Sequence, residues 1–500
     1  MGNFAVASGH HLTTQTAAEV LRAGGTAVDA AIAGALMACI AEPVLASPLA
    51  GGFLMVSPPN KQVQILDAFI QTPRRKRSLA DTDIREIEVD FGQSKQTFHC
   101  GAGTIGTPGL VPGLFEAHSQ FGRIPMAELA APAIEAARTG TLITAFQAEV
   151  LGYVETIFMA SDGARALYAP SGKLLGEGDI LTNPDMGDVL EVMALEGPRF
   201  FQEGEVAQAL LSLEGGHLTA DDLQSYHPIG RKPLAFTRGG VEVDLNPAPS
   251  LGGVQIALAL QALPAKFDER LLARCLYEVA RIRKETDLDH HPANGQKILL
   301  DPAMVGSLQK TLSAHQAATR GTTHISVIDQ NGMGAAFTLS NGEGCGLIVP
   351  GTGIMANNML GEDDLVPDGV NSWHEDTRLA SMMCPMALRD NEALTMMGSG
   401  GSNRIRSALA QVALKLIDGG SALEDAVHAP RMHIDDTPQI LDFEDTGTEE
   451  RRESLLTEFP SANPWPKQSM FFGGVHAVRG TSKGFEAAGD ERRSGAVLTE

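Results

Sequence analysis

The pattern of hydrophobic and polar residues is most regular in the middle of the chain, where two alternating stretches flank a turn. The first stretch covers residues 321–329, and the second covers residues 334–340. Asn331-Gly332 lies between them. This dipeptide favours a two-residue type I′ turn, which needs positive φ at both central positions. The pattern therefore predicts a β-hairpin.

The loop length decides which side chains meet at the open end of this hairpin. With a two-residue loop, Thr323 faces Ser340 and Thr322 faces Asn341. Two hydroxyl side chains and an amide then gather at this end, which suits a threonine nucleophile with a second hydroxyl beside it. A four-residue loop would shift these partners.

Helical spacing of apolar residues predicts most of the other elements. Residues 14–41 form two helical patterns that meet at Gly24-Gly25, and Thr219 is a candidate N-cap for a short helix. Segment 286–320 is polar and irregular around His290-His291 and becomes helical towards Arg320. We further expect helices over 126–138, 188–195, 206–213, 256–263, 269–285, 405–418 and 422–428, and strands over 354–358, 393–397 and 470–478.

Composition and charge narrow the classes of function. The chain has 500 residues, of which 43% are hydrophobic and 20% are charged, as is ordinary for a soluble globular protein. This length suits two or three domains, or one large layered α/β unit. The net charge of −23 argues against binding to nucleic acid, because phosphate contacts need concentrated Lys and Arg.

Targeting and cysteine patterns predict a cytoplasmic protein. The first residues lack the charged and apolar regions of a signal peptide. The longest compact apolar run, Ala30 to Ala41, has 12 residues and is too short to cross a bilayer. The five cysteines form no Cys-x-x-Cys pair, so neither a zinc site nor a disulfide framework is expected. We predict no metal, no cofactor and no membrane partner.

The common hydrolase motifs are missing from the sequence. It contains no Gly-x-Ser-x-Gly elbow, no His-Glu-x-x-His zinc motif and no Gly-Lys-Ser/Thr phosphate loop. A threonine with a free α-amine needs none of these. Its amine, with an ordinary pKa near ~8, can take the proton of its own hydroxyl.

Several motifs resemble the γ-glutamyltransferase (γ-glutamyltranspeptidase) family, and they follow the order of that family from about residue 5 to residue 490. They lie at 20–31 (VLRAGGTAVDAA), 51–54 (GGFL), 107–113 (TPGLVPG), 216–223 (GHLTADDL), 249–253 (PSLGG), 322–324 (TTH), 357–358 (NN) and 398–402 (GSGGS). The resemblance implies an α/β fold of the N-terminal-nucleophile hydrolase type, with a four-layer αββα sandwich. It also implies self-cleavage between Gly321 and Thr322, giving a large portion 1–321 and a small portion 322–500 that together form one unit. Thr323 is the rival nucleophile.

The resemblance also implies roles for other residues. Gly400 and Gly401 would form the oxyanion hole, and Ser340 would support the nucleophile. The next polar contact of the family falls at Gly342, so either neighbour, Asn341 or Glu343, is a candidate to replace it. The substrate α-amino group would be held by Glu362, or by Asp363 if a small insertion is allowed, and Ser381 would brace the α-carboxylate.

The sequence departs from the family where the substrate carboxylate is bound. The family places an arginine where this chain has Phe69, and an aromatic ring cannot replace a bidentate guanidinium contact. One residue of the family's serine pair is Ala380 here. Arg74 or Arg75, from the neighbouring loop, is the candidate to restore the contact.

The activity that the resemblance implies is γ-glutamyl transfer or hydrolysis through an ester on Thr322. Glutathione-like amides would be the donors, and water, amino acids or peptides the acceptors. Two alternatives remain open at this point. The protein could be an amide acylase with the same nucleophile and another acyl donor, or a homologue without catalysis.

Overall fold

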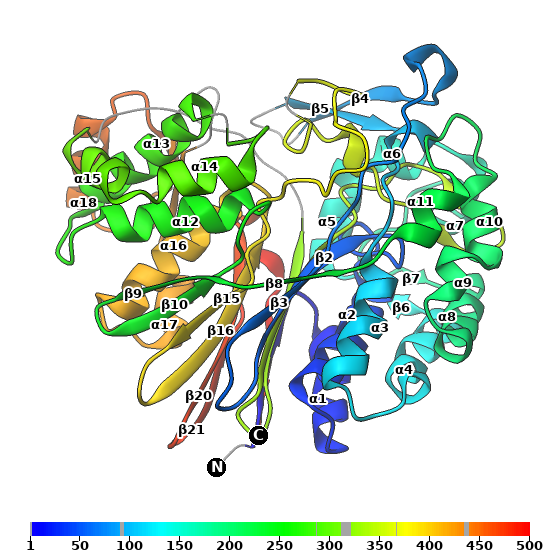
Figure 1. Cartoon of the computed structure of the whole chain (residues 1–500), viewed down its shortest axis with the longest axis horizontal. Coiled ribbons are helices and arrows are strands. Elements are labelled where there is room, and N and C mark those ends of the chain that lie inside the picture. The colour runs from blue at the N-terminus through cyan, green and yellow to red at the C-terminus, as the bar shows by residue number, and fades with distance from the viewer. Residues whose placement is uncertain (1–2, 91–94, 287, 312–321, 367, 435–439) are drawn as a thin grey trace.

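Two β-sheets packed face to face form the centre of the protein. A computed structural model describes the chain except for residues 1–2, 91–94, 287, 312–321, 367 and 435–439. Helices cover the outer face of each sheet, so the layers follow the order αββα (Figure 1). This is the four-layer arrangement expected from the sequence. None of the described helices is both long and apolar enough to span a membrane.

The first sheet has seven strands and is built around the central hairpin. Its neighbours along the sheet are antiparallel. In spatial order the strands are β22 (Ala496–Thr499), β1 (Ala5–Ser8), β11 (Thr323–Ile328), β12 (Gly334–Ser340), β2 (Gly51–Ser57), β3 (Gln64–Ala68) and β8 (Ile229–Arg231).

The predicted hairpin is present, but its predicted register was wrong by one residue. Thr323 pairs with Leu339, not with Ser340. The loop has three residues, because the Asp329 backbone N–H donates to Met333 O at 3.0 Å. The Asp329 carboxylate also accepts from the backbone N–H groups of Asn331 and Met333. Of the loop residues 330–332, only Gly332 has positive φ, as in a three-residue hairpin loop.

The second sheet has six strands and carries the glycine-rich segment at one strand end. It too is antiparallel throughout. In spatial order the strands are β21 (Gly484–Ala488), β20 (Gly474–Thr481), β16 (Ala393–Gly400), β15 (Met386–Arg389), β10 (Val241–Leu245) and β9 (Leu234–Arg238). Strand β16 crosses over both β11 and β12 of the first sheet.

Helix α2 (Ala27–Ala41) shows why the outer layers pack closely. Every residue of this helix is buried, because it lies between the first sheet and helix α4 (Met126–Thr139). Its alanines and glycine permit this close approach on all sides. Thr26 and Asp29 form a capping box at its start. The sheet is also covered by α1 (His11–Arg22) and α3 (Leu110–Phe121), and α8 (Pro184–Glu196) packs on α4.

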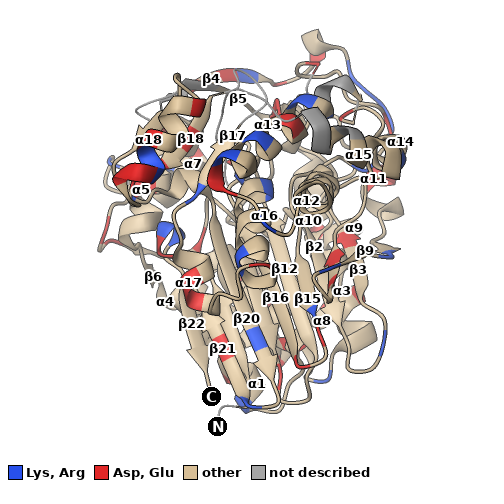
Figure 2. Cartoon of the chain, turned by 90° about the vertical axis from the view of Figure 1, so that its left-hand side faces the viewer, with Lys and Arg blue, Asp and Glu red and all other residues tan. Residues whose placement is uncertain are grey.

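The opposite outer layer lies on the second sheet. Its helices are α12 (Leu251–Ala262), α16 (Arg404–Ile417) and α17 (Leu423–His428), with α13 (Glu269–Glu285) packed on α12. The remaining elements are α5 (Ala145–Tyr153), α6 (Glu155–Phe158), α7 (Asp162–Tyr168), α9 (Arg199–Gln202), α10 (Glu205–Leu211), α11 (Ala220–Ser225), α14 (Pro292–Leu299), α15 (Pro302–Thr311), α18 (Glu449–Glu458), β4 (Arg85–Asp90), β5 (Lys95–Cys100), β6 (Thr141–Leu142), β7 (Ile180–Leu181), β13 (Ile348–Val349), β14 (Ile354–Met355), β17 (Met432–Ile434), β18 (Leu441–Glu444) and β19 (Asn463–Trp465). Figure 2 marks the Lys, Arg, Asp and Glu residues, many of which belong to helices and loops.

Most of the predicted helices are confirmed, and two predicted strands were wrong in part. The chain is irregular around His290-His291, as predicted, but it becomes helical earlier than expected, since α14 and α15 each begin at a proline, a residue suited to the first helical turn. The expected helix towards Arg320 lies outside the described residues. The strand predicted over 354–358 ends at Met355. Residues 470–472 form a short 3₁₀ turn, and the strand starts only at Gly474.

Candidate active site

Thr322 and Ser340 lie side by side at one end of the sandwich. Continuing the β11–β12 register by one residue places Thr322 opposite Ser340, so both side chains point to the same face. Each residue is only 4% exposed. Both line a narrow cavity with about 20 Å³ accessible to the centre of a water molecule, which is room for about one water. In the observed register Thr322 thus lies opposite Ser340, whereas the predicted register placed Thr322 opposite Asn341.

The rival nucleophile, Thr323, points away from this cavity. Successive side chains of a strand alternate between faces. Thr323 Oγ1 donates to Glu42 Oε2 at 2.7 Å, and Thr13 Oγ1 donates to Glu42 Oε1 at 3.1 Å. Glu42 is fully buried at the end of α2, and burial raises its pKa to about 7. Thr323 thus belongs to a buried cluster beneath the cavity.

His324 is a buried structural residue. Its Nδ1 lies 2.8 Å from Thr338 Oγ1, and its Nε2 lies 2.8 Å from Ser326 Oγ. Burial and the nearby His476 hold the pKa of His324 well below its ordinary value, so the ring is neutral. Both ring nitrogens are used within the strands, and neither lies at the cavity.

Gly400 ends β16 directly against Thr322. A Cβ on Gly400 would lie 1.9 Å from the backbone carbonyl oxygen of Thr322, so no larger residue fits there. Gly401 has a φ of +112°, and the chain then turns into α16 at Arg404. The glycine turn and the start of a helix thus lie beside Thr322, and the oxyanion role of Gly400 and Gly401 stays a prediction.

A buried arginine behind this turn was not predicted from the sequence. The Arg493 guanidinium would contact a Cβ on Gly400 at 3.5 Å and a Cβ on Gly401 at 3.3 Å. Burial lowers the pKa of Arg493 to about 10, which leaves the group charged at neutral pH. Within the described part of the chain, its Nε and Nη1 have no hydrogen-bond partner.

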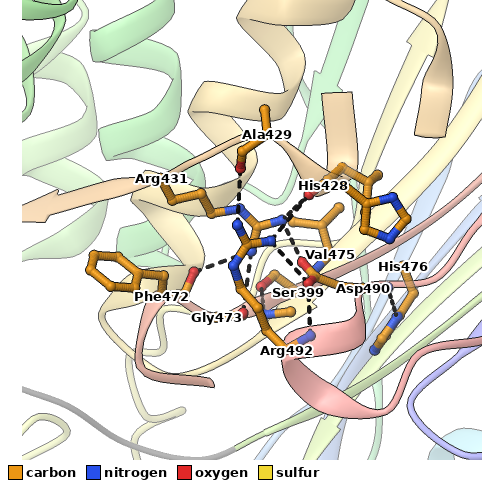
Figure 3. A network of polar contacts seen from close by, with 12 residues as sticks. Ser399, His428, Ala429, Arg431, Phe472, Gly473, Val475, His476, Asp490 and Arg492 are labelled. Carbon is orange, nitrogen blue, oxygen red and sulfur yellow. Dashed lines mark hydrogen bonds and ion pairs between the residues drawn. The ribbon is translucent and has the colours of Figure 1, made fainter. Parts of the chain in front are cut away.

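A network of buried charges holds the segment that carries Arg493 (Figure 3). Arg492 Nη2 donates to Glu444 at 2.5 Å, and its Nη1 donates to Asp490 at 3.1 Å. Arg431 forms an ion pair with Asp490 and donates to Gly473 O at 3.2 Å. Because Gly473 packs against Gly401, this network supports the glycine turn from behind.

The acidic residues predicted near the substrate occupy different environments. Glu362 is buried and lines the cavity. Asp363 points outwards, with 49% of its side chain exposed and its Oδ1 3.9 Å from His99 Nδ1. Asp364, which was not predicted, lines the cavity instead and accepts from Ser402 Oγ at 3.1 Å.

Asn341 and Glu343 are buried but are not among the residues that line the cavity. Asn341 Nδ2 donates to Met355 O at 3.5 Å. The Glu343 backbone N–H donates to Asn358 Oδ1 at 2.9 Å. Asn358 therefore shapes the loop that follows Ser340. The Asn-Asn pair in the sequence was the available signal for this residue.

The side of the cavity predicted to bind a carboxylate is apolar. Phe69 lines it, and Ser381 lies there with its Oγ accepting from the Met383 backbone N–H. Arg75 is exposed and is not among the lining residues. None of the described residues that line the cavity is Lys or Arg. They are Phe69, Thr322, Ser340, Met359, Glu362, Asp364, Leu365, Ser381, Met382, Met383, Ser402 and Ile405.

Arg378 lies behind this wall and is bound by other groups. Arg378 Nη1 donates to Phe69 O at 3.1 Å, to Asp67 Oδ1 at 3.1 Å and to Tyr226 Oη at 2.7 Å. Its side chain is 8% exposed. The guanidinium thus supports the end of β3 and is held away from the cavity.

Comparisons with known proteins agree with this arrangement. The family model described as Gamma-glutamyltranspeptidase matches residues 13–499. The chain is 27% identical to the Acylase ACY 1 proenzyme of Pseudomonas sp. (strain SE83), covering 95% of this chain and 89% of that protein. It is 26% identical to the Glutathione hydrolase proenzyme of Escherichia coli (strain K12), covering 88% and 82%.

A solved structure supports the fold. The cephalosporin acylase from Bacillus halodurans superposes with a TM-score of 0.85 at 22% identity, covering 99% of this chain and 96% of that one. The two chains thus share the same αββα fold. Together with the family match over almost the whole length, this shows that the chain belongs to the gamma-glutamyltranspeptidase family.

Proposed function

We propose that the protein is a self-processing amide hydrolase and acyltransferase in which Thr322 is the nucleophile. The observation that carries the proposal is the placement of Thr322 beside Ser340, with Gly400 against its carbonyl oxygen. Only Thr322 of the threonine pair faces the cavity, while Thr323 is bound by Glu42. Cleavage before Thr322 would leave portions 1–321 and 322–500 associated as one folded unit.

Processing and turnover use the same oxygen atom. In processing, Thr322 Oγ attacks the carbonyl carbon of Gly321, the C–N bond breaks, and the acyl group moves to oxygen as an ester. Water then hydrolyses this ester, leaving a carboxylate on Gly321 and a free amine on Thr322. In turnover, this amine takes the hydroxyl proton as Oγ attacks the donor amide, and the proton passes to the leaving amine. Water, an amino acid or a peptide accepts the acyl group.

Two groups of the site can stabilise the tetrahedral oxyanion. The backbone at Gly400 and Gly401 precedes a helix start, where N–H groups lack helical partners and the dipole is positive. The buried Arg493 cation lies directly behind this backbone. A donor of this kind contributes ~3 kcal/mol to transition-state stabilisation.

The lining of the cavity favours an acyl donor that carries an amine and lacks a carboxylate. Glu362 and Asp364 supply negative charge, and no described lining residue is Lys or Arg. Phe69 and three methionines make much of the remaining wall apolar, and its other polar groups are uncharged hydroxyls. A donor carboxylate would meet like charge and apolar surface there. We therefore infer an amide acylase, in keeping with the acylase among the relatives.

γ-Glutamyl transfer from glutathione-like amides is the second candidate. Glu362 favours it, because this residue lines the cavity where the resemblance expects the α-amino group to bind. A relative named glutathione hydrolase also favours it. The two candidates share the nucleophile and differ only in the acyl group that they accept.

Intact-mass measurement tests processing. The parent is expected to give two fragments that split before Thr322, whereas Thr322→Ala gives one full-length chain. Two fragments from the variant would refute the assignment. A single unsplit and inactive parent would identify a homologue without catalysis.

Three matched anilides test the acyl group. 4-Aminobutyryl anilide is γ-glutamyl anilide without its α-carboxylate, and glutaryl anilide is the same compound without its amine. We expect kcat/KM to be highest for the 4-aminobutyryl compound and lowest for the glutaryl compound, with steps of about tenfold or more for each charged contact. A γ-glutamyl rate above the other two would favour the second candidate.

A further inference from the structure

A large cavity lies at the end of the sandwich that is opposite to Thr322. Its volume is about 660 Å³, and it opens between the two sheets where the turns of several hairpins meet. Gly332, in the β11–β12 turn, is one of its lining residues. Strand β11 has six residues between this turn and Thr322. At about 3.3 Å per residue, the cavity is roughly 20 Å from the nucleophile.

One buried carboxylate in this cavity lacks a partner. Asp244, on β10, lines the cavity and is only 3% exposed. Among the described residues, its carboxylate accepts no hydrogen bond and forms no ion pair. Burial and the neighbouring Glu242 raise the pKa of Asp244 to about 6, although Arg389 opposes this shift, so the group is still mostly ionised at pH 7.5. A buried carboxylate of this kind gains stability when a ligand brings a positive charge to it.

Among the residues around Asp244, Arg389 attracts this carboxylate through space but forms no ion pair with it. Arg389 Nη2 donates to Ser57 Oγ at 2.7 Å, which joins the second sheet to the first. Arg389 Nη1 lies 3.5 Å from Glu242 Oε2. Both terminal nitrogens of Arg389 are therefore already engaged. Two exposed lysines, Lys61 and Lys232, stand among the lining residues and form no ion pair with any described residue.

We propose that this cavity binds a short peptide with free termini, whose ammonium group pairs with Asp244 and whose carboxylate faces Lys61 and Lys232. An ammonium offers three donors to the unsatisfied carboxylate. The cavity volume lies within the range of small-molecule sites, about 300–1,000 Å³, and exceeds the needs of one amino acid. A metal ion is a poor occupant, because the described residues contain no group of three His, Cys, Asp or Glu side chains placed to hold one.

Calorimetric titration of the full-length chain tests the site with triglycine as the probe. The Thr322→Ala form is used, so that no probe is consumed. We expect saturable binding that weakens at least about tenfold in Asp244→Asn, since one charged contact is lost. N-acetyl-triglycine should bind at least about tenfold more weakly than triglycine. Triglycine amide should also bind more weakly than triglycine, and Lys232→Gln should not change the affinity for the amide.

Three results would overturn the proposal: no saturable triglycine binding, equal binding by Asp244→Asn, or equal binding of the N-acetylated peptide. Lys483→Gln, an exposed lysine change away from the cavity, is the matched control and should leave the affinity unchanged. A thermal melt of each variant checks folding. In the otherwise native sequence, Asp244→Asn should process and turn over amides at the parent rate. The titration measures binding and needs no catalysis. Its result can therefore be interpreted even if the proposed function is wrong.

Discussion

The buried carboxylate of Glu42 allows a quantitative test of the cluster that it forms with Thr323 and Thr13. Burial raises its pKa from 4.5 to about 7, although Thr323 and Thr13 donate hydrogen bonds to it. A carboxyl whose pKa is higher in the folded state adds stability below its unfolded pKa and loses it as the pH rises through the folded pKa. The window is therefore pH 4.5 to 7. At about 1.4 kcal/mol per pH unit, the shift corresponds to ~3 kcal/mol, as an order of magnitude.

The Glu42→Gln variant removes this titration and keeps an acceptor oxygen for one of the two threonines. For a chain of 500 residues, the unfolding entropy is roughly 1 kcal/mol/K, so ~3 kcal/mol corresponds to about 3 °C in Tm. We expect the Tm of the variant minus the Tm of the parent to be larger at pH 8 than at pH 5 by about this amount. Both proteins carry Thr322→Ala, so that each remains one chain.

The comparison of Tm differences removes the effect of other titrating groups, because they are common to both proteins. Scanning fluorimetry at a fixed heating rate gives the values, since unfolding of a large chain is often irreversible. A Tm difference that stays constant from pH 5 to pH 8 would refute the reasoning. It would mean that Glu42 is not charged in a buried setting at pH 8.

Three further changes act on the candidate active site. Gly400→Ala places a methyl group 1.9 Å from Thr322 O, so mass spectrometry should show an unsplit and inactive chain, and normal splitting would contradict the geometry. In a time course, Ser340→Ala should slow splitting and turnover by about tenfold or more. Ser340→Thr keeps the hydroxyl and should retain most of the activity. Equal rates for the two variants would exclude a role for the hydroxyl. Arg493→Met keeps the bulk and removes the cation, so it should lower kcat by ~10²-fold with little change in KM; a change in KM alone would place Arg493 outside transition-state stabilisation.

The local parts of the fold could be predicted from the sequence, because they depend on periodicity and turn chemistry. The bounds of α13 agree with the prediction, and the hairpin was found from Asn331-Gly332. Its register was missed for a specific reason. The Asp329 side chain binds two backbone N–H groups of the loop and also accepts from the Ala27 backbone N–H at the start of α2. That last contact joins residues 302 positions apart, which no local pattern reports.

The candidate site shows the same division between local and distant information. Thr322, Ser340 and Gly400 belong to motifs that could be recognised in the sequence. Glu42 and Arg493 could not be assigned, because nothing in their sequence neighbourhoods shows that folding brings them to Thr323 and to the glycine turn.

Arg378 shows why a missing residue is hard to interpret from sequence alone. The absence of the family arginine at Phe69 raised the question whether another arginine takes over, and Arg74 and Arg75 were the candidates by proximity in sequence. The structure places a third arginine, Arg378, behind that wall, yet its donors are used by Asp67, Phe69 O and Tyr226. Freeing this guanidinium for a substrate would leave the buried Asp67 carboxylate with one fewer charged partner. The same contacts that stabilise the end of β3 therefore oppose carboxylate binding by Arg378, and this supports the proposal of an acyl group without a carboxylate.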